Sequence, residues 1–334
     1  MSPRSPQRNI RGRVLATLAS VAIITGTSVG YKVFIEQTTE PAVWVSTTGN
    51  DGTCERNNEN APCLTLNRAY QIAECGDLVR VWGGSYSGQT LNASDKSCDG
   101  SFVVFKSAPN ETATFNSIHT ENGPDWIELN TISITNRLNL WGPNTQNWRV
   151  IGVDGGSWDV SGTNIYFEGN DWGPCYGVNP CGGQNFLVGR NFHMNGDTIH
   201  DFRDTSEGAH FECIFYHGSG TGGTLIENSR FWNCYTYDIF FQTTGSWDGP
   251  TVIQNNWFGR SANTETEDRQ SAVIVASNVP PDDVLIRFNS FAPGQGVVTE
   301  GGDDPTNFRI VGNIIGTAPD CNWGNGPGEI TWEY

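Results

Sequence analysis

Two stretches of the chain repeat one pattern of apolar and polar positions. Leu225 to Phe231 and Val252 to Phe258 each place an apolar residue, a small polar residue and an aromatic residue at the same offsets. The pattern continues in both directions, and its successive polar positions are 27, 32, 27, 33 and 24 residues apart by subtraction. A period of about 20–50 residues is typical of a solenoid. The pattern therefore predicts a stack of similar coils.

Stacking places equivalent residues of neighbouring coils about 4.8 Å apart, so each column has a structural meaning. An amide column forms a ladder of side-chain hydrogen bonds at a bend, and an aromatic column forms a strip of core. A second apolar column predicts at least two sheets. The polar column is Asn170, Asp197, Ser229, Asn256, Asn289 and Asn313; the aromatic column is Trp172, Phe231, Phe258 and Phe291; the second apolar column is Leu187, Ile214, Ile239, Ile274 and Val298.

Residues 41–90 predict an N-terminal cap. Short strands are expected at Val43–Val45 and at 78–82, and the stretch 63–74 has apolar residues at helical spacing. Gly76 follows where a C-terminal helix cap requires a positive φ. A solenoid exposes the open end of its first coil, and an amphipathic helix lying across that end covers it.

The motifs of this cap resemble a known superfamily. Gly49-Asn50-Asp51-Gly52, Pro62-Cys63-Leu64-Thr65-Leu66, Gly76-Asp77-Leu78-Val79 and Gly83-Gly84-Ser85-Tyr86 occur in the order seen at the start of right-handed parallel β-helix proteins of the pectate-lyase-like superfamily. The resemblance implies an all-β, single-stranded right-handed parallel β-helix with a short N-terminal capping helix. It implies no single chemistry, because the superfamily includes lyases, hydrolases, epimerases and adhesins. The arginine-bearing strand of pectate lyases and the clustered aspartates of polygalacturonases are not recognised in this sequence.

Composition and charge fit this fold class and limit the partners. Of the 334 residues 40 are Gly and 16% are charged, which suits short strands joined by tight turns. The formal charge of −17 disfavours nucleic acid or an anionic membrane surface as a partner. Lysine occurs only at Lys32, Lys96 and Lys106, so an anionic polymer would have to be held by arginine.

The first 35 residues form an export segment. Four arginines up to Arg13 precede an apolar run from Val14 to Gly30. The segment is either a signal peptide cleaved near Gly30 or a membrane anchor, and both place the β-helix domain of residues 36–334 outside the cytoplasm. Membrane contact is expected only through this segment. The end of the chain alternates like a strand with no cap after it, so we expect a further C-terminal segment.

Nine cysteines in an exported chain predict disulfides. Spacing favours the pairs Cys54–Cys63, Cys75–Cys98, Cys175–Cys181 and Cys213–Cys234. Cys321 is left over, and a partner in another chain or in further residues is expected for it.

The densest group of reactive side chains lies between Asp197 and Asp238, and it includes His200. One hypothesis makes it a catalytic site that moves a proton during cleavage of a glycosidic bond. The alternative is that His210 and Glu212 form a buried pair, because they share the parity of Ile214. The candidate catalytic residues are His210, Glu212, Arg203 and Asp201, and the candidate substrate-binding residues are Arg230, Tyr235, Tyr237 and His217.

No cofactor is expected, with Ca²⁺ at the paired acids 282–283 and 303–304 or in the run 265–268 as the alternative. The sequence thus predicts an extracellular protein, secreted or tethered to the outer face of the cytoplasmic membrane, that binds an extracellular polysaccharide or cleaves it as a lyase or hydrolase. The second hypothesis is a non-catalytic surface protein that binds glycans or serves as a spacer. Whether the chain is an enzyme stays open at this level.

Overall fold

The computed structural model describes residues 40–93, 95–121, 123–142, 144–176, 185–203, 211–217, 222–242, 249–259, 273–276, 283–293, 295–300, 307–315 and 330–333. The predicted export segment, Cys181, His210 and Cys321 lie outside these ranges. Within them, no helix has the length and apolar character needed to cross a bilayer.

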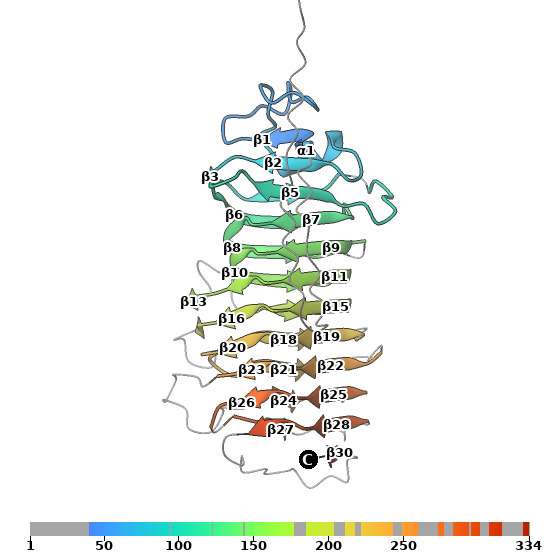
Figure 1. The fold of residues 1–334 in the computed structure, drawn as a ribbon, viewed down its shortest axis with the longest axis vertical. Helices are drawn as coiled ribbons and strands as arrows, with labels where there is room; N and C mark the ends of the chain where they lie inside the picture. The colour runs from blue at the N-terminus through green and yellow to red at the C-terminus, as the bar shows by residue number, and fades with distance from the viewer. Residues whose placement is uncertain are drawn as a thin grey trace, which may run out of the picture. The chain divides into compact units, whose positions relative to one another are not determined.

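Two parallel sheets run the length of the coil stack (Figure 1). Each coil contributes one strand to the first sheet, here called sheet A. Its strands, in order, are β1 (Val43–Val45), β2 (Leu78–Val81), β5 (Val103–Ser107), β7 (Ile127–Asn130), β9 (Gln146–Ile151), β11 (Thr163–Glu168), β15 (Arg190–Asn195), β19 (Thr224–Glu227), β22 (Thr251–Gln254), β25 (Val284–Arg287), β28 (Phe308–Val311) and β30 (Ile330–Glu333).

The second sheet, sheet B, has two short strands in its first coil, one long strand in each of the next three coils, and split strands in the later coils, where the chain leaves the sheet between the two halves. A separate two-stranded sheet joins the excursions of two neighbouring coils and is formed by β13 (Cys175–Tyr176) and β17 (Phe202–Arg203). The strands of sheet B are β3 (Gly84–Tyr86), β4 (Gln89–Leu91), β6 (Ala113–Thr120), β8 (Ser133–Leu140), β10 (Asp154–Val160), β12 (Asp171–Trp172), β14 (Phe186–Leu187), β16 (Thr198–His200), β18 (Ile214–His217), β20 (Arg230–Trp232), β21 (Ile239–Gln242), β23 (Trp257–Phe258), β24 (Val273–Ala276), β26 (Ser290–Phe291), β27 (Val297–Glu300) and β29 (Ile314–Ile315).

The predicted fold is confirmed: the chain is a right-handed parallel β-helix. Every strand pair is parallel, and consecutive coils pair in register, as in Met194↔Ile226↔Ile253↔Ile286 of sheet A. Crossovers between parallel strands of one sheet are right-handed in almost all proteins because of the strand twist.

The polar column is structural, as predicted. The Asn256 side chain donates to Asn289 Oδ1 at 3.0 Å and to the carbonyl of Ile226 at 3.0 Å, and its own Oδ1 accepts from the Ser229 amide at 2.9 Å. Asn289 repeats the arrangement with Asn313. Asn289 uses both lone pairs of its Oδ1 and both N–H groups of its amide, so the ladder satisfies the backbone at a buried bend.

The aromatic column is core, again as predicted. Trp172, Phe231 and Phe258 are fully buried, and the rings of Phe231 and Phe258 stack at 5.1 Å. Phe291 extends the stack at 4.9 Å. The interior is therefore filled by like residues lying on like residues.

The register of the second apolar column was predicted incorrectly in part. Ile214 pairs with Ile239 and Ile274 with Val298, but Leu187 pairs with Tyr216 and Ile239 pairs with Val273. The short strands of this column follow excursions of different length, so their spacing in sequence is not fixed. A sequence pattern can therefore assign an apolar residue next to the true register partner in its place.

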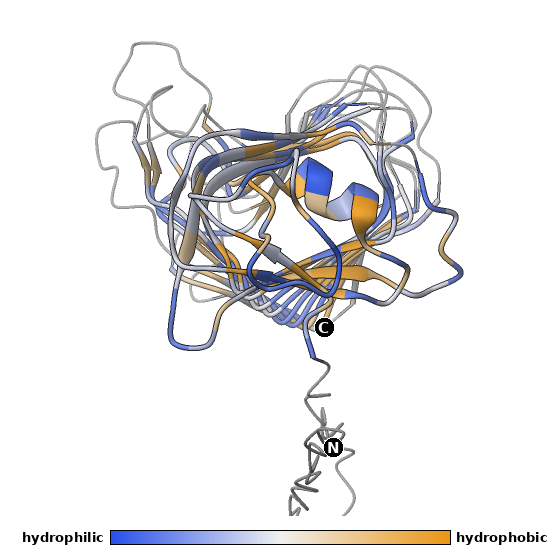
Figure 2. Ribbon diagram, turned by 90° about the horizontal axis from the view of Figure 1, so that it is seen from above, coloured by the Kyte–Doolittle hydropathy of each residue, from blue (hydrophilic) through white to orange (hydrophobic). Residues whose placement is uncertain are grey.

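The N-terminal cap matches its prediction in kind, with a shorter helix. Helix α1 (Leu66–Ile72) begins after Thr65, whose side chain accepts from the Arg68 amide at 3.1 Å. It buries Leu66, Ala69 and Tyr70, and Figure 2, a view along the stack, shows it within the outline of the coils. Gly76 has the expected positive φ of 87°, although it lies beyond the helix end.

Three predicted disulfides are present: Cys54–Cys63, Cys75–Cys98 and Cys213–Cys234. Cys175 is also disulfide-bonded. Its predicted partner Cys181 is among the residues not described, so that pairing stays a prediction. Disulfides of this number are typical of proteins that fold in an oxidising compartment.

Candidate functional site

One outward-facing column crosses sheet B from the cap to the later coils. Side chains alternate along a strand, so the residue directly before each inward-facing position of the core column points outward. Strand pairing places these outward residues in register from coil to coil, and the two acids are adjacent near the middle. The column consists of Ser85, Thr114, Ser133, Asp154, Asp171, Thr198, Arg230 and Trp257.

The centre of the site is the carboxylate pair Asp154 and Asp171. Their strands β10 and β12 are neighbours, and the two residues are direct register partners. Local desolvation raises the pKa of Asp154, and the charge of Asp171 raises it further, whereas nearby His200 lowers it. Two like carboxyl groups in different surroundings are the arrangement that separates an acid from a base.

His200 connects this pair to a third carboxylate. Its Nε2 lies 3.2 Å from Asp171 Oδ1, and its Nδ1 lies 2.7 Å from Asp201 Oδ2. Asn233 donates to the other oxygen of Asp201. A carboxylate that accepts from one ring nitrogen fixes the imidazole, and the other nitrogen is then placed to exchange a proton with Asp171.

Close backbone approach makes this geometry possible. Gly173 follows β12 with a φ of 124°, and a Cβ there would overlap the carbonyl oxygen of His200 on the next coil. Only glycine fits both the backbone conformation and the contact. The coil carrying Asp171 therefore packs directly on the coil carrying His200.

Aromatic side chains continue the site on its C-terminal side. The imidazole of His200 stacks on the Trp232 ring at 4.8 Å with an interplanar angle of 11°, and Trp232 lies 6.2 Å from Trp257. Trp257 is 44% exposed. A Cβ on Gly259 would overlap the Trp257 ring, so this glycine leaves room for the indoles. An exposed indole face is suited to the apolar face of a ring-shaped ligand.

Two of the predicted catalytic residues are resolved at the side-chain level, and they have different surroundings. Asp201 joins the cluster through His200. Glu212 is fully buried, and burial raises its pKa to about 8. For Arg203 the structure describes the backbone, which pairs with Tyr176. His210 lies outside the described residues, so its role stays a prediction.

The predicted substrate-binding residues also lie in different parts of the structure. Arg230 is exposed in the outward column, one coil from Trp257. Tyr235 is half-buried and packs against the core. Tyr237 and exposed His217 instead belong to an aromatic cluster over the second half of sheet B, where the rings of Phe215 and Phe240 stack at 5.2 Å.

Among the described residues, one group of potential metal ligands lies close together, but it is not suited to bind a metal. Cys213, Cys234 and Asp238 converge, but the two sulfurs form a disulfide and have no thiolate to offer. Of the acids considered for Ca²⁺, Asp283 alone is described, and the Ca²⁺ alternative stays a prediction.

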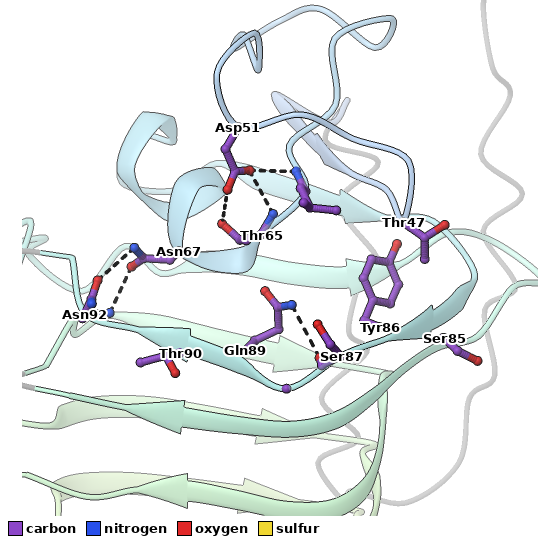
Figure 3. A pocket seen from close by; sticks show the side chains of 12 residues that line it. Thr47, Asp51, Thr65, Asn67, Ser85, Tyr86, Ser87, Gln89, Thr90 and Asn92 are labelled. Atoms are coloured by element: carbon purple, nitrogen blue, oxygen red, sulfur yellow. Dashed lines mark hydrogen bonds between the residues drawn. The ribbon is translucent and has the colours of Figure 1, made fainter.

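A hollow lies at the N-terminal cap (Figure 3). It has a volume of about 460 Å³ and is open to solvent between the start of α1 and strands β3 and β4. Its lining is mainly hydroxyl and amide groups: Thr47, Asp51, Leu64, Thr65, Asn67, Ser85, Tyr86, Ser87, Gly88, Gln89, Thr90 and Asn92. Ser85 belongs to the outward column as well, so one residue of the hollow's lining is in register with the carboxylate pair.

Sequence reasoning missed Asp154, Asp171, Trp232 and Trp257. A usable signal exists for Asp171 and Trp257, since each directly precedes a buried aromatic residue and alternation turns it outward. Asp154 gives no such signal, because it lies only 17 residues before Asp171, outside the longer period of the later coils.

The comparisons with known proteins support the fold. No family model matches the sequence, and no curated protein matches it. Among solved structures, one of XylC in complex with xylose matches with a TM-score of 0.56 and 12% identity over 82% of this chain and 69% of that chain. The pectate lyase Pel9A matches with a TM-score of 0.47 and 14% identity over 88% of this chain and 78% of that chain. An alginate lyase from Paenibacillus sp. str. FPU-7 matches with a TM-score of 0.45 and 14% identity over 78% and 95%.

Proposed function

We propose that this protein is an extracellular glycoside hydrolase that cleaves a polysaccharide on the outer face of sheet B. The observation that carries the proposal is the register pair Asp154 and Asp171, with His200 held between Asp171 and Asp201. The solved structures that resemble the chain include polysaccharide lyases and glycosidases, and the disulfides support an oxidising compartment.

The two carboxyl groups have separate roles. Asp154, whose pKa is raised, keeps its proton to higher pH and donates it to the oxygen of the glycosidic bond as that bond breaks. Asp171 attacks the anomeric carbon and forms a glycosyl ester, which water then hydrolyses while Asp154 acts as base. Register neighbours lie about 4.8 Å apart, close to the separation of about 5–5.5 Å that this double displacement requires.

Hydrolysis is favoured over elimination by the charge of the site. Elimination removes a proton beside a uronate carboxylate, and that step needs cations to neutralise the carboxylate. Here three carboxylates, Asp154, Asp171 and Asp201, surround one imidazole. Arg230 is the one cation of the outward column.

The second candidate is a non-catalytic glycan-binding protein. The pair of indoles Trp232 and Trp257 favours it, because stacking on a sugar ring needs no acid or base. In that case the carboxylates only form hydrogen bonds to sugar hydroxyl groups.

A substrate screen with matched variants tests the proposal. The purified protein is incubated with neutral and acidic polysaccharides, and new reducing ends and unsaturated products are measured. Asp154→Asn and Asp171→Asn are expected to lower kcat by about 10²–10⁴-fold with an unchanged melting temperature. Asp99→Asn, at an exposed acid of the cap region, is the control. Wild-type turnover in both site variants, or no product from any polysaccharide, contradicts the hydrolase.

A further inference from the structure

The hollow at the N-terminal cap is suited to a small polar molecule. Its volume of about 460 Å³ falls in the range of about 300–1,000 Å³ that is usual for ligand sites. Figure 3 shows Ser87, Gln89 and Thr90 along its strand side and Asp51, Thr65 and Asn67 on its loop and helix side. Hydroxyl and amide groups act as both donors and acceptors, as the hydroxyl groups of a sugar do.

The backbone amides at the start of α1, which would attract an anion, are already used inside the protein. The amides of Leu64 and Thr65 donate to the Asp51 carboxylate at 2.8 and 3.0 Å, and the Thr65 hydroxyl donates to it at 2.8 Å. Gln89 Oε1 accepts from the Leu66 amide at 3.1 Å. Among the residues that the structure describes, the lining contains no lysine, arginine or histidine. An anionic sugar therefore meets one carboxylate and no cation, and a neutral sugar is the better match.

Strand register connects the hollow to the carboxylate pair. Ser85 pairs with Thr114, Thr114 with Ser133 and Ser133 with Asp154, so three coil steps separate them. At about 4.8 Å a step this distance is about 14 Å along the stack. The intervening Thr114 and Ser133 are small, polar and partly exposed, so they leave a polar track between the hollow and the acids.

We propose that the cap hollow is a distal subsite that binds a neutral sugar unit of the same glycan whose bond lies over Asp154 and Asp171. The glycan chain then runs parallel to the stack from Ser85 towards Trp257. The subsite rests on the proposed hydrolase for its link to turnover, but its binding of neutral glycan can be measured separately.

The test compares short and long neutral oligosaccharides derived from xylan and cellulose. Ser85→Trp and Thr90→Trp fill the hollow from exposed strand positions, and Thr90→Val removes one hydroxyl group while keeping the side-chain shape. Both Trp variants are expected to lower kcat/KM about tenfold for long chains and to leave short chains unchanged. Thr90→Val is expected to have a smaller effect in the same direction. Val252→Trp, on the outer face of sheet A, is the matched control.

Calorimetric binding to the Asp171→Asn variant separates this proposal from the hydrolase. Tighter binding of long than of short neutral chains, abolished by Ser85→Trp, supports the subsite even if Asp171 proves not to be needed for turnover. Equal affinity for both lengths, an unchanged affinity in the Trp variants, a preference for oligogalacturonate, or no binding of neutral chains overturns it.

Discussion

His200 Nε2 lies 3.2 Å from Asp171 Oδ1, although the two residues are 29 apart in sequence by subtraction. The contact exists because successive coils of the β-helix place β12 and β16 side by side in sheet B. Asp201 holds the other ring nitrogen at 2.7 Å. His200, held by Asp201, is therefore placed to exchange a proton with Asp171, the register partner of Asp154.

The protonation of Asp154 should respond in opposite directions to its two charged neighbours. Asp171→Asn removes the negative charge that raises the pKa of Asp154, so that pKa should fall. His200→Gln removes the group that lowers it, so the pKa should rise. Titration of the carboxyl carbons by NMR measures both shifts, with Asp99→Asn as the control. A shift of the same sign in both variants would contradict the arrangement.

The buried carboxyl group of Glu212 should make stability fall as pH rises. Burial raises its pKa from 4.5 to about 8, so between these values the folded protein holds a proton that the unfolded chain has released. Its stabilising contribution is complete below the unfolded pKa and is lost as pH rises through the folded one, at up to about 1.4 kcal/mol per pH unit.

Glu212→Gln should therefore reduce this pH dependence. The variant is expected to gain more than about 1 kcal/mol over the wild type near pH 8 relative to pH 5. Chemical denaturation at a series of pH values measures it, and Glu59→Gln, at an exposed position, should change nothing. A pH dependence of stability that is the same in Glu212→Gln as in the wild type would contradict the raised pKa of this carboxyl group.

Removing one member of the amide ladder should destabilise the fold without changing the site. Asn256→Ala leaves the Ser229 amide and the Ile226 carbonyl without their side-chain partners at a buried bend. The expected loss is about 2–4 kcal/mol in the free energy of unfolding. Asn60→Ala, at an exposed loop position, serves as the control in urea unfolding. A loss below about 0.5 kcal/mol would show that the ladder contributes little.

The indole pair should contribute to glycan affinity. Trp257→Ala removes an exposed ring face, and burying about 60 Å² of it at about 25 cal/mol per Å² corresponds to about 1.5 kcal/mol. Binding of the neutral glycan by calorimetry should weaken about tenfold. Gly259→Ala should act in the same direction, because the added methyl group displaces the Trp257 ring. Phe288→Ala, another exposed aromatic residue, is expected to bind as the wild type does.

The alternation of inward and outward side chains along a strand explains which site residues the sequence could predict. The ladder residues Asn170 and Asn256 were assigned to the scaffold because they repeat, and the structure confirms this. Asp171 and Trp257 lie next to these repeats and point outward by simple alternation. The hypothesis that His210 and Glu212 are catalytic rested on local density, which does not distinguish the inside of a coil from the outside.

The sequence by itself determined the coil repeat, the ladder, the aromatic core, the N-terminal cap and three disulfides, because each is written as a local period or spacing. Only the tertiary structure decided that Asp154, Asp171 and His200 meet, and that Ser85 stands in the same column. Coils of unequal length bring these residues into register, and the length of an excursion between strands is not encoded in any periodic pattern. Stacking therefore converts an irregular spacing in sequence into a regular spacing of about 4.8 Å in space.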